Sequence, residues 1–308
     1  KEEMGFLKWM KEIWKKLNSS HPDIVLGSEF GISTIIIILH KFVTKSHYKI
    51  VIINDDSYDM LVNNNQFTKM HARAVKAMMP LVDDVINVEP RVAAYNQQKY
   101  QKGIYFPIIC NDVIAKKRLE RVLPISQNYV SKYQLEGKKV LLFVGRLVAL
   151  KNVKFALRAF IKANLDNTIF VIVGDGSEKE KLEKIAAGNP AVIFTGRLEG
   201  DELYAWYNVG QVFTLPSYKE PFGAVTNEAL VAGCKVLISK DAGSNCLVKD
   251  GKNGYIIDPH HETKFIEKLK LAFYSMKPLK MQLVVKENMM VSSFEEHIKS
   301  LYARMENL

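Results

Sequence analysis

Cysteine is scarce in this chain of 308 residues, which contains only Cys110, Cys234 and Cys246. None of the three lies in a Cys-x-x-Cys pair, which argues against a disulfide framework or a structural zinc site and fits a reducing cytoplasm. Long apolar runs are missing too, since the longest aliphatic run, Ile35–Leu39, is far too short to cross a bilayer. Because no signal peptide is visible, we expect a cytoplasmic protein, and the inner face of the membrane is the second location considered.

Charge of one sign does not dominate the composition, although the formal net charge is +10. The apolar fraction of 48% and the charged fraction of 25% are ordinary for a soluble globular protein, and the length suits two domains. Basic residues are spread over both halves, and Lys116–Arg118 is more typical of a solvated helix face than of a DNA contact, so we expect no nucleic-acid partner. A mildly basic surface suits anionic small substrates or a membrane surface.

The first half of the chain reads as an alternating series of strands and helices. Strands are expected at Asp23–Leu26, Lys49–Ile53 and Val85–Val88, with helices over Glu2–Leu17 and Phe67–Met79. This series has fewer strands than a complete domain of its type needs. We therefore expect an incomplete N-terminal domain whose first strand–loop–helix unit is missing.

A linker is expected next, and a second, clearer series follows it. Pro107, Pro124 and the polar stretch Ser126–Gln134 indicate the linker. The strands of the second series are expected at Lys139–Val144, Thr168–Val173, Ala191–Phe194, Gln211–Leu215 and Lys235–Ser239, and its helices at Val153–Ala163, Glu178–Ala187, Asp201–Asn208 and Ala224–Ala232. Such alternation predicts a parallel sheet that is covered on both faces and binds ligands at the carboxyl ends of its strands.

The stretch from Glu220 to Glu228 is the most informative part of the sequence. It lies between an expected buried strand and a helix, whose first N–H groups attract anions such as phosphate. Gly223 lets the backbone approach a phosphate closely. The two carboxylates would repel phosphate, but they could accept hydrogen bonds from the hydroxyls of a ribose and of a second sugar. The alternative is an acidic helix start that the helix dipole favours.

Three further loops follow expected strands. Gly145 and Arg146 are followed by Lys151, and the planar fork of Arg with the point charge of Lys can close on a diphosphate; the alternative is an ordinary loop with solvated bases. The stretch Gly174–Gly176 begins like a dinucleotide fingerprint but lacks its third glycine, so it indicates a turn with little direct role and counts against hydride transfer. Residues Thr195–Leu198 could read a nucleobase edge or simply form a turn.

Taken together, these loops resemble the GT-B glycosyltransferases, specifically the retaining group called family 4, or glycosyl transferases group 1. The resemblance runs from about Lys139 to Pro259, and Ser293–Met305 resembles the family's last helix, which crosses back onto the first domain. Each element is weak alone, but the ordered set is specific. It consists of Val144–Leu147 with Lys151–Asn152, Val173–Gly176, Phe194–Gly196, Pro216–Ser217, the pair Glu220 and Glu228, Glu228–Leu230 with Gly233, and Asp250–Gly254.

The resemblance implies catalytic roles for Arg146, Lys151 and Glu220. The two cations would hold the donor diphosphate and stabilise its charge as it leaves, and Glu220 would bind hydroxyls of the transferred sugar. Glu228 would bind the ribose hydroxyls. The remaining donor-binding residues implied by the family lie beside the diphosphate or the base, and they are Gly145, Arg197, Leu198, Gly223, Ala224 and Val225.

The family needs no metal and no cofactor other than its nucleoside-diphosphate sugar donor. Consistently, the sequence has no Asp-x-Asp that could hold a metal–diphosphate, and the adjacent His260 and His261 are expected at the surface. The first half departs from the family, because it shows no Gly-Gly loop and has Asn54–Asp56 where a His is frequent. Asp55 or Asp56 could bind an acceptor hydroxyl or act as a base, although a solvated turn is the favoured interpretation.

The opening helix has an amphipathic pattern. Its lysines Lys8, Lys11, Lys15 and Lys16 lie largely away from the apolar stripe, so the helix could rest on an anionic membrane surface. Packing against its own sheet is the favoured alternative. The stripe consists of Phe6, Trp9, Met10, Ile13, Trp14 and Leu17.

The sequence therefore predicts two Rossmann-like α/β domains facing a cleft. The expected parts are a partial acceptor-side domain over residues 1–136, a nucleotide-sugar-binding domain over 137–290 and a crossing helix over 291–308. The predicted function is metal-independent transfer of a hexosyl group, with retention, to a hydroxyl of a carbohydrate or lipid-linked acceptor in polysaccharide or glycolipid synthesis. The alternatives are a nucleotide-sugar epimerase of the same fold and a non-catalytic nucleotide-sugar-binding subunit.

Overall fold

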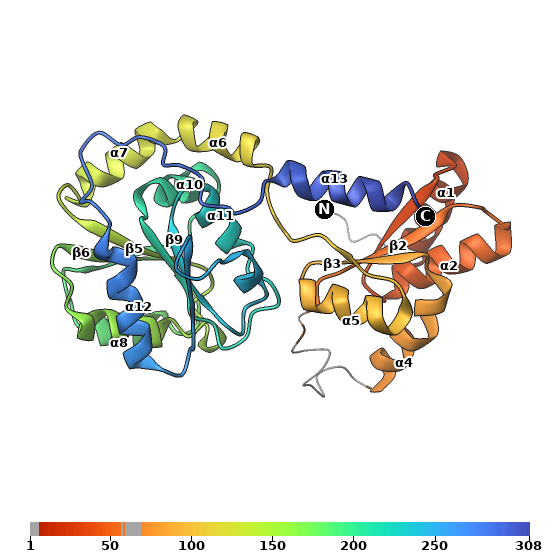
Figure 1. Ribbon diagram of the computed structural model, residues 1–308, viewed down its shortest axis with the longest axis horizontal. Coiled ribbons are helices and arrows are strands. Elements are labelled where there is room, and N and C mark those ends of the chain that lie inside the picture. The colour runs from red at the N-terminus through yellow and green to blue at the C-terminus, as the bar shows by residue number, and fades with distance from the viewer. Residues whose placement is uncertain (1–5, 57, 59–68) are drawn as a thin grey trace. The chain divides into compact units, whose positions relative to one another are not determined.

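The computed structural model describes residues 6–56, 58 and 69–308, and the chain forms two compact units (Figure 1). Unit 1 comprises the chain up to Pro107 together with His297–Leu308, and unit 2 comprises Ile108–Glu296. Each unit has one parallel sheet with helices packed on it, which confirms the α/β class. Unit 2 begins at Ile108, whereas the first domain was expected to extend to residue 136.

Unit 1 is built on a four-stranded sheet of order β1-β2-β3-β4. Ile50 and Ile52 of β2 point to a core cluster that also takes side chains of α1, α2 and α4, whereas Val51 points to the opposite face and meets Leu301 and Met305 of α13. The strands are β1 (Ile24–Ser28), β2 (Lys49–Asn54), β3 (Asp84–Asn87) and β4 (Ile104–Tyr105), and the helices are α1 (Phe6–Ser20), α2 (Ile32–Thr44), α4 (Lys69–Met78), α5 (Pro90–Tyr100) and α13 (Phe294–Met305).

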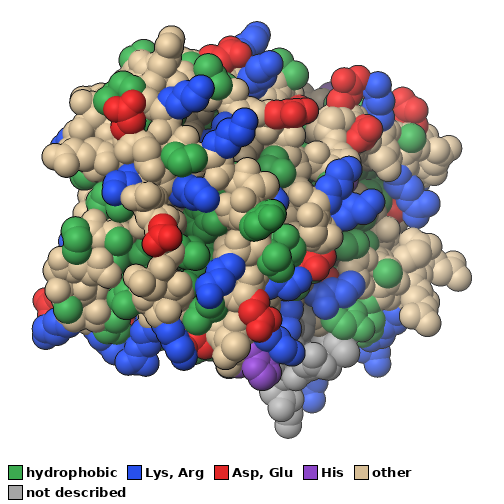
Figure 2. All heavy atoms as spheres, turned by 60° about the vertical axis from the view of Figure 1, so that its left-hand side comes forward, with side chains coloured by type: hydrophobic (Ala, Val, Ile, Leu, Met, Phe, Trp, Pro, Cys, Tyr) green, Lys and Arg blue, Asp and Glu red, His purple; other side chains and the backbone are tan. Residues whose placement is uncertain are grey.

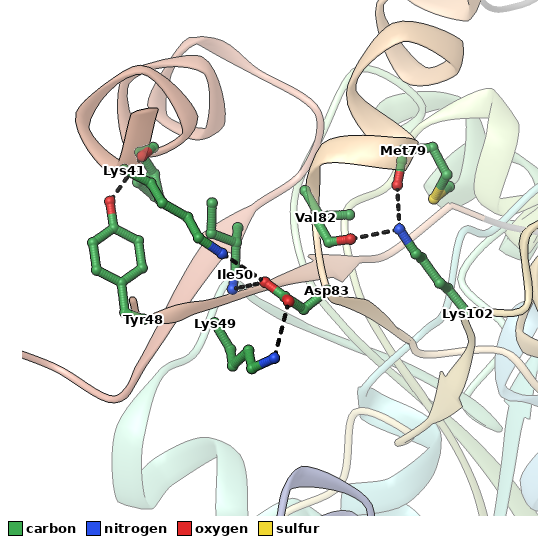
Figure 3. A network of polar contacts seen from close by, with 9 residues as sticks. Lys41, Tyr48, Lys49, Ile50, Met79, Val82, Asp83 and Lys102 are labelled. Atoms are coloured by element: carbon green, nitrogen blue, oxygen red, sulfur yellow. Dashed lines mark hydrogen bonds and ion pairs between the residues drawn. The ribbon is translucent and has the colours of Figure 1, made fainter. Parts of the chain in front are cut away.

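Asp83, just before β3, ties the start of β2 to α2 (Figure 3). Its carboxylate accepts hydrogen bonds from the Ile50 N–H at 2.7 Å and from the Lys41 ammonium at 3.1 Å, and Lys49 lies 3.5 Å away. Burial alone would raise the pKa of Asp83, but these donors and cations hold it below its usual value. Asp83 therefore acts as an ionised acceptor that fixes the entry of the chain into the sheet.

Helix α1 packs its apolar stripe inward. Trp14 meets the His40 ring edge-on at 4.8 Å, Leu17 packs against the core cluster of unit 1, and the lysines at positions 8, 11, 15 and 16 are exposed. The favoured expectation of packing is therefore confirmed for these side chains. Residues 2–5 of the expected helix lie outside the described residues, as do 67–68 of the later helix.

Unit 2 contains a six-stranded sheet of order β10-β9-β8-β5-β6-β7, the strand order of a doubly wound Rossmann-like fold. Helices α8 and α12 cover one face, and α10 and α11 cover the other (Figure 1). The strands are β5 (Lys139–Val144), β6 (Thr168–Val173), β7 (Val192–Gly196), β8 (Val212–Leu215), β9 (Lys235–Ser239) and β10 (Gly254–Ile257), and the helices are α6 (Asp112–Arg121), α7 (Leu123–Lys132), α8 (Val153–Ala163), α9 (Lys179–Ala186), α10 (Gly200–Val209), α11 (Val225–Val231) and α12 (Glu262–Tyr274).

The expected linker is wrong for Pro124 and most of Ser126–Gln134, which lie in helix α7, whereas Pro107 lies at the boundary between the units. Pro124 lies in the first turn of α7, where a proline sacrifices no helical hydrogen bond. Ser126 is buried, and its hydroxyl donates to the carbonyl oxygens of Val122 and Ala205. The polar side chains that suggested a linker thus attach α7 to α10.

Backbone contacts hold together the loops that follow β5 and β6. Gly174 has φ +150°, and a Cβ built on it would lie 1.9 Å from the carbonyl oxygen of Gly145. The Gly174 N–H donates to the Gly196 carbonyl at 2.9 Å, which adds the end of β7 to the same assembly. The glycine at this position is therefore required for close backbone packing.

The surface carries its basic charge in a dispersed form. Figure 2 shows Lys and Arg side chains scattered among acidic, apolar and polar ones over the face presented, rather than gathered in a stripe. Within residues 6–56, 58 and 69–308, no helix combines the length and the hydropathy that crossing a bilayer requires.

We expect Asp83→Asn to destabilise unit 1 by about 1–2 kcal/mol, because charge-assisted hydrogen bonds become neutral ones. Hydrogen exchange of peptides covering α2 and β2 should measure the loss, with the exposed Asp55→Asn as the matched control. Since the folded-state pKa is lowered, the stabilisation is present above pH 3.8 and is lost as the pH falls through the folded value. An equal difference between the variants below that value would contradict this account.

We expect Gly174→Ala to destabilise unit 2 by roughly 1–3 kcal/mol, because the loops after β5 and β6 must move apart. Gly188→Ala is the control, since Gly188 also has a positive φ of +70° but nothing lies within 4 Å of its added Cβ. Urea unfolding of both variants measures the difference. Similar losses would mean that backbone strain alone, rather than the contact with Gly145, decides the cost.

Candidate active site

The strand order of unit 2 reverses between β5 and β8, and ligands of such sheets bind where the loops after those two strands diverge. The loop after β5 carries Lys151, and the loop after β8 carries Glu220. The Lys151 ammonium and the Glu220 carboxylate form an ion pair, and both side chains are largely buried, with 16% and 12% exposed. The structure thus brings two of the predicted catalytic residues into direct contact.

Both partners of this ion pair are held by their backbones. Asn152, directly after Lys151, adopts a left-handed conformation with φ 53°, and its amide donates to the Pro259 carbonyl at 3.1 Å. Glu220 pairs as a parallel β-bridge with Ala242, and its carbonyl accepts a 3.0 Å hydrogen bond from the Gly243 N–H. The two charged groups therefore start from fixed positions.

A pocket of about 520 Å³ lies at the carboxyl ends of β5, β6 and β7. It brings together three predicted donor-binding residues, Gly145, Arg197 and Leu198, and the predicted catalytic residue Arg146. Arg146 is exposed, and Arg197 pairs with the carboxylate of Glu199. The pocket lining thus combines the guanidinium groups of Arg146 and Arg197 with the acidic Asp175 and Glu199, beside the backbone of three glycines.

The turn before α11 places the next group of predicted residues. Gly223 has φ +92°, and a Cβ there would lie 2.6 Å from Leu215 and 3.1 Å from Glu220, so glycine is required beside the ion-paired glutamate. Ala224 precedes α11, which begins at Val225. The N–H of Thr226, the second residue of α11, donates to the Gly223 carbonyl at 2.9 Å, so the turn is bonded directly to the start of the helix.

Glu228, in the first turn of α11, is bound by two tyrosines of α10. The Tyr207 hydroxyl donates to Oε2 at 2.7 Å, and the Tyr204 hydroxyl donates to Oε1 at 3.3 Å. Arg118 lies 3.6 Å above the Tyr204 ring. Sequence reasoning missed all three residues, and the only signal was the spacing of three between the tyrosines, which places them on one face of a helix.

The tyrosines remain donors near neutral pH. Burial, and then the charge of Glu228, raise the pKa of Tyr204 to about 12 and that of Tyr207 well above its usual value. Burial and the same carboxylate raise the pKa of Cys110 to about 11, so its thiol stays protonated. Glu228 is therefore surrounded by neutral groups and keeps its role as an acceptor.

The carboxyl edge of the unit 1 sheet carries a buried polar cluster. Asn87 accepts from Asn96 at 2.9 Å and from Asn54 at 3.4 Å, and the buried carboxylate of Glu89 pairs with Arg91. Asp55, considered from the sequence as an acceptor contact, is exposed after β2. The amides at this edge are buried and hydrogen-bond to one another.

No group of three or more His, Cys, Asp or Glu side chains within the described part of the chain is placed to hold a metal ion. His260 is exposed and stacks on the Tyr218 ring at 5.0 Å. The candidate site contains the side-chain cations of Arg146, Lys151 and Arg197.

Comparison with known proteins finds sequences that are related to part of the chain. The sulfoquinovosyl transferase SQD2 of Arabidopsis thaliana is 35% identical over 136 residues, which cover 43% of this chain and 26% of that protein. A GDP-mannose-dependent alpha-mannosyltransferase of Mycolicibacterium smegmatis is 34% identical over 123 residues, covering 40% of this chain and 31% of the relative. The alignments therefore span about a third or less of these relatives.

Solved structures share the fold of the whole chain. The Anabaena protein HepE in complex with UDP superposes with a TM-score of 0.75 at 15% identity, covering 96% of this chain and 82% of that one. A sucrose-phosphate synthase from Thermosynechococcus elongatus gives a TM-score of 0.70 at 17% identity, with 98% and 78% covered. The model of the family described as glycosyl transferases group 1 matches residues 126–290, more than half of the chain, and this chain therefore belongs to that family.

Proposed function

We propose that this protein transfers a sugar from a nucleoside diphosphate to an acceptor hydroxyl. The observation that carries the proposal is the ion pair of Lys151 and Glu220 at the switch point of the unit 2 sheet, on the loops after β5 and β8. The loop after β5 also supplies Arg146 to the pocket that Arg197 lines. Cationic side chains can bind a diphosphate, and carboxylates can accept hydrogen bonds from the hydroxyls of a sugar. The family and the fold support this combination, which a simple anion site would not need.

In the proposed reaction, the bond between the anomeric carbon and the diphosphate oxygen breaks, and the acceptor oxygen bonds to that carbon. The acceptor proton passes to the departing diphosphate. Arg146 and Lys151 stabilise the charge that develops on this leaving group, which is electrostatic catalysis by preorganised cations. Glu220 accepts hydrogen bonds from the sugar, Glu228 accepts them from the ribose, and Leu198 borders the base.

We propose that the transfer proceeds with retention and without a metal ion. Attack on the face that the diphosphate leaves lets the diphosphate itself receive the acceptor proton, so no protein nucleophile is required. The side-chain cations at the pocket take the part that a metal would otherwise play in neutralising the diphosphate.

The biological setting stays a prediction. Relatives named as transferases of sulfoquinovose and of mannose support an acceptor in polysaccharide or glycolipid synthesis. Attachment to an anionic membrane surface is also a prediction; the lysines of α1 are exposed for it, although the apolar stripe of that helix packs inward.

A thermal-shift panel of UDP, GDP, ADP and their glucose and mannose conjugates tests the proposal. We expect one base to stabilise the protein, equally with and without a chelator, and Arg146→Ala to weaken diphosphate binding about ten- to a hundredfold. The exposed Arg158→Ala on α8 is the control.

Chelator-sensitive binding would contradict metal independence, and binding without transfer to any sugar or lipid acceptor would favour the non-catalytic subunit. Interconversion of the donor sugars would favour the epimerase.

The two glutamates should differ in ligand selectivity. We expect Glu228→Gln to weaken UDP and UDP-glucose alike, because ribose is common to both. Glu220→Gln should weaken only the sugar conjugate and leave UDP at least as tight, since the change releases Lys151 from its ion pair. Each loss should be about tenfold, measured by calorimetry with Glu262→Gln as the surface control. Identical profiles for the two variants would refute the division of roles.

A further inference from the structure

The carboxylate of Glu228 is held on both of its oxygens. Tyr204 and Tyr207, three residues apart on α10, donate to Oε1 at 3.3 Å and to Oε2 at 2.7 Å. A carboxylate has about four lone-pair sites, so two remain for a ligand after these bonds are made. The tyrosines therefore fix the orientation of the carboxylate without exhausting its capacity as an acceptor.

Tyr207 is the more rigid of the two donors. Its side chain is fully buried, and its ring packs against Phe213 with a centroid distance of 6.4 Å. The buried ammonium of Lys286 donates to the carbonyls of Tyr207 at 3.0 Å and of Asn208 at 2.6 Å, which closes the last turn of α10. Neither the ring nor the backbone of Tyr207 can shift without breaking these contacts.

Tyr204 is held differently, from its exposed side. The guanidinium of Arg118 covers its ring at 3.6 Å, and the Arg118 Nε lies 3.3 Å from Asp201 of α10. Its longer hydrogen bond to Glu228 makes it the weaker donor. The pair thus combines one buried, short contact with one peripheral, longer contact on the same carboxylate.

We propose that Tyr207, assisted by Tyr204, is a positioning residue that orients Glu228 for the ribose hydroxyls of the nucleotide. This inference rests on the proposed function, because it takes the ribose role of Glu228 from it. Tyr207 acts only through the carboxylate and touches no ligand itself. Its loss should therefore lower the preference for ribose and leave the rest of the binding energy in place.

The test compares the affinities of UDP and 2′-deoxy-UDP for the full chain by calorimetry. We expect the wild type to prefer UDP and Glu228→Gln to lose that preference. Tyr207→Phe should lower the preference about tenfold, which is the effect of one hydrogen bond to a charged group, with the affinity for 2′-deoxy-UDP unchanged. Tyr204→Phe should lower it less. The matched control is Tyr129→Phe, which also removes a hydroxyl that contacts α10. In the wild type this hydroxyl lies 3.5 Å from the Glu202 carbonyl.

Each outcome has one meaning. A full ribose preference in Tyr207→Phe, while Glu228→Gln has lost its preference, would overturn the positioning role and leave the proposed function intact. Equal weakening of UDP and 2′-deoxy-UDP by Tyr207→Phe would show a structural role and would also overturn it. No ribose preference in the wild type would overturn both the ribose role of Glu228 and this inference. If Tyr207→Phe does not fold, Tyr204→Phe is compared with Tyr129→Phe instead. A lower preference for UDP over 2′-deoxy-UDP in Tyr204→Phe alone would support the positioning role, and equal preferences in the two variants would overturn it.

Discussion

The approach of Gly174 to Gly145 is the constraint on which the candidate site depends. Because a Cβ at Gly174 would lie 1.9 Å from the Gly145 carbonyl oxygen, the loops after β5 and β6 can meet only through bare backbone. The hydrogen bond from the Gly174 N–H to Gly196 extends the contact to the end of β7. Arg146 and Arg197 start from loops that this contact fixes, so the glycines shape the pocket by packing, whatever they contribute to a ligand directly.

Two carboxylates beside a proposed diphosphate site raise an electrostatic problem, and the chain solves it in two ways. Glu220 is neutralised by Lys151, so the pair carries no net charge until a ligand competes for the lysine. Glu228 instead receives hydrogen bonds from two tyrosine hydroxyls, whose dipoles stabilise negative charge on its carboxylate. The two carboxylates are thus held by different means, Glu220 by an ion pair and Glu228 by hydroxyl groups.

The sequence predicted the parts of unit 2 in which local pattern and buried sheet agree, and β5, β6 and α8 begin and end where expected. Gly223 was singled out from the sequence for a close approach of the backbone to phosphate, whereas the structure shows a left-handed backbone packed against Leu215 and Glu220, which the sequence did not predict. Composition misled where polar residues serve tertiary contacts, as in α7, whose Ser126 is buried against α10. The contacts of the two tyrosines with Glu228 could not be predicted from the sequence, since residues more than twenty positions apart leave no local pattern when they meet.

The carboxylate of Asp84 in β3 binds the last helix of the chain to unit 1, whereas its neighbour Asp83 binds other partners. Asp83 takes Lys41 and Lys49, whereas the buried Asp84 takes Arg304 of α13 at 3.1 Å and the Gly103 N–H at 2.7 Å. A buried carboxylate without its partner is costly, so Asp84 favours the docked helix. The apolar side chains of α13 cover the same face of the sheet. The chain therefore passes between the units twice, and unit 1 is complete only when its last helix has returned to it.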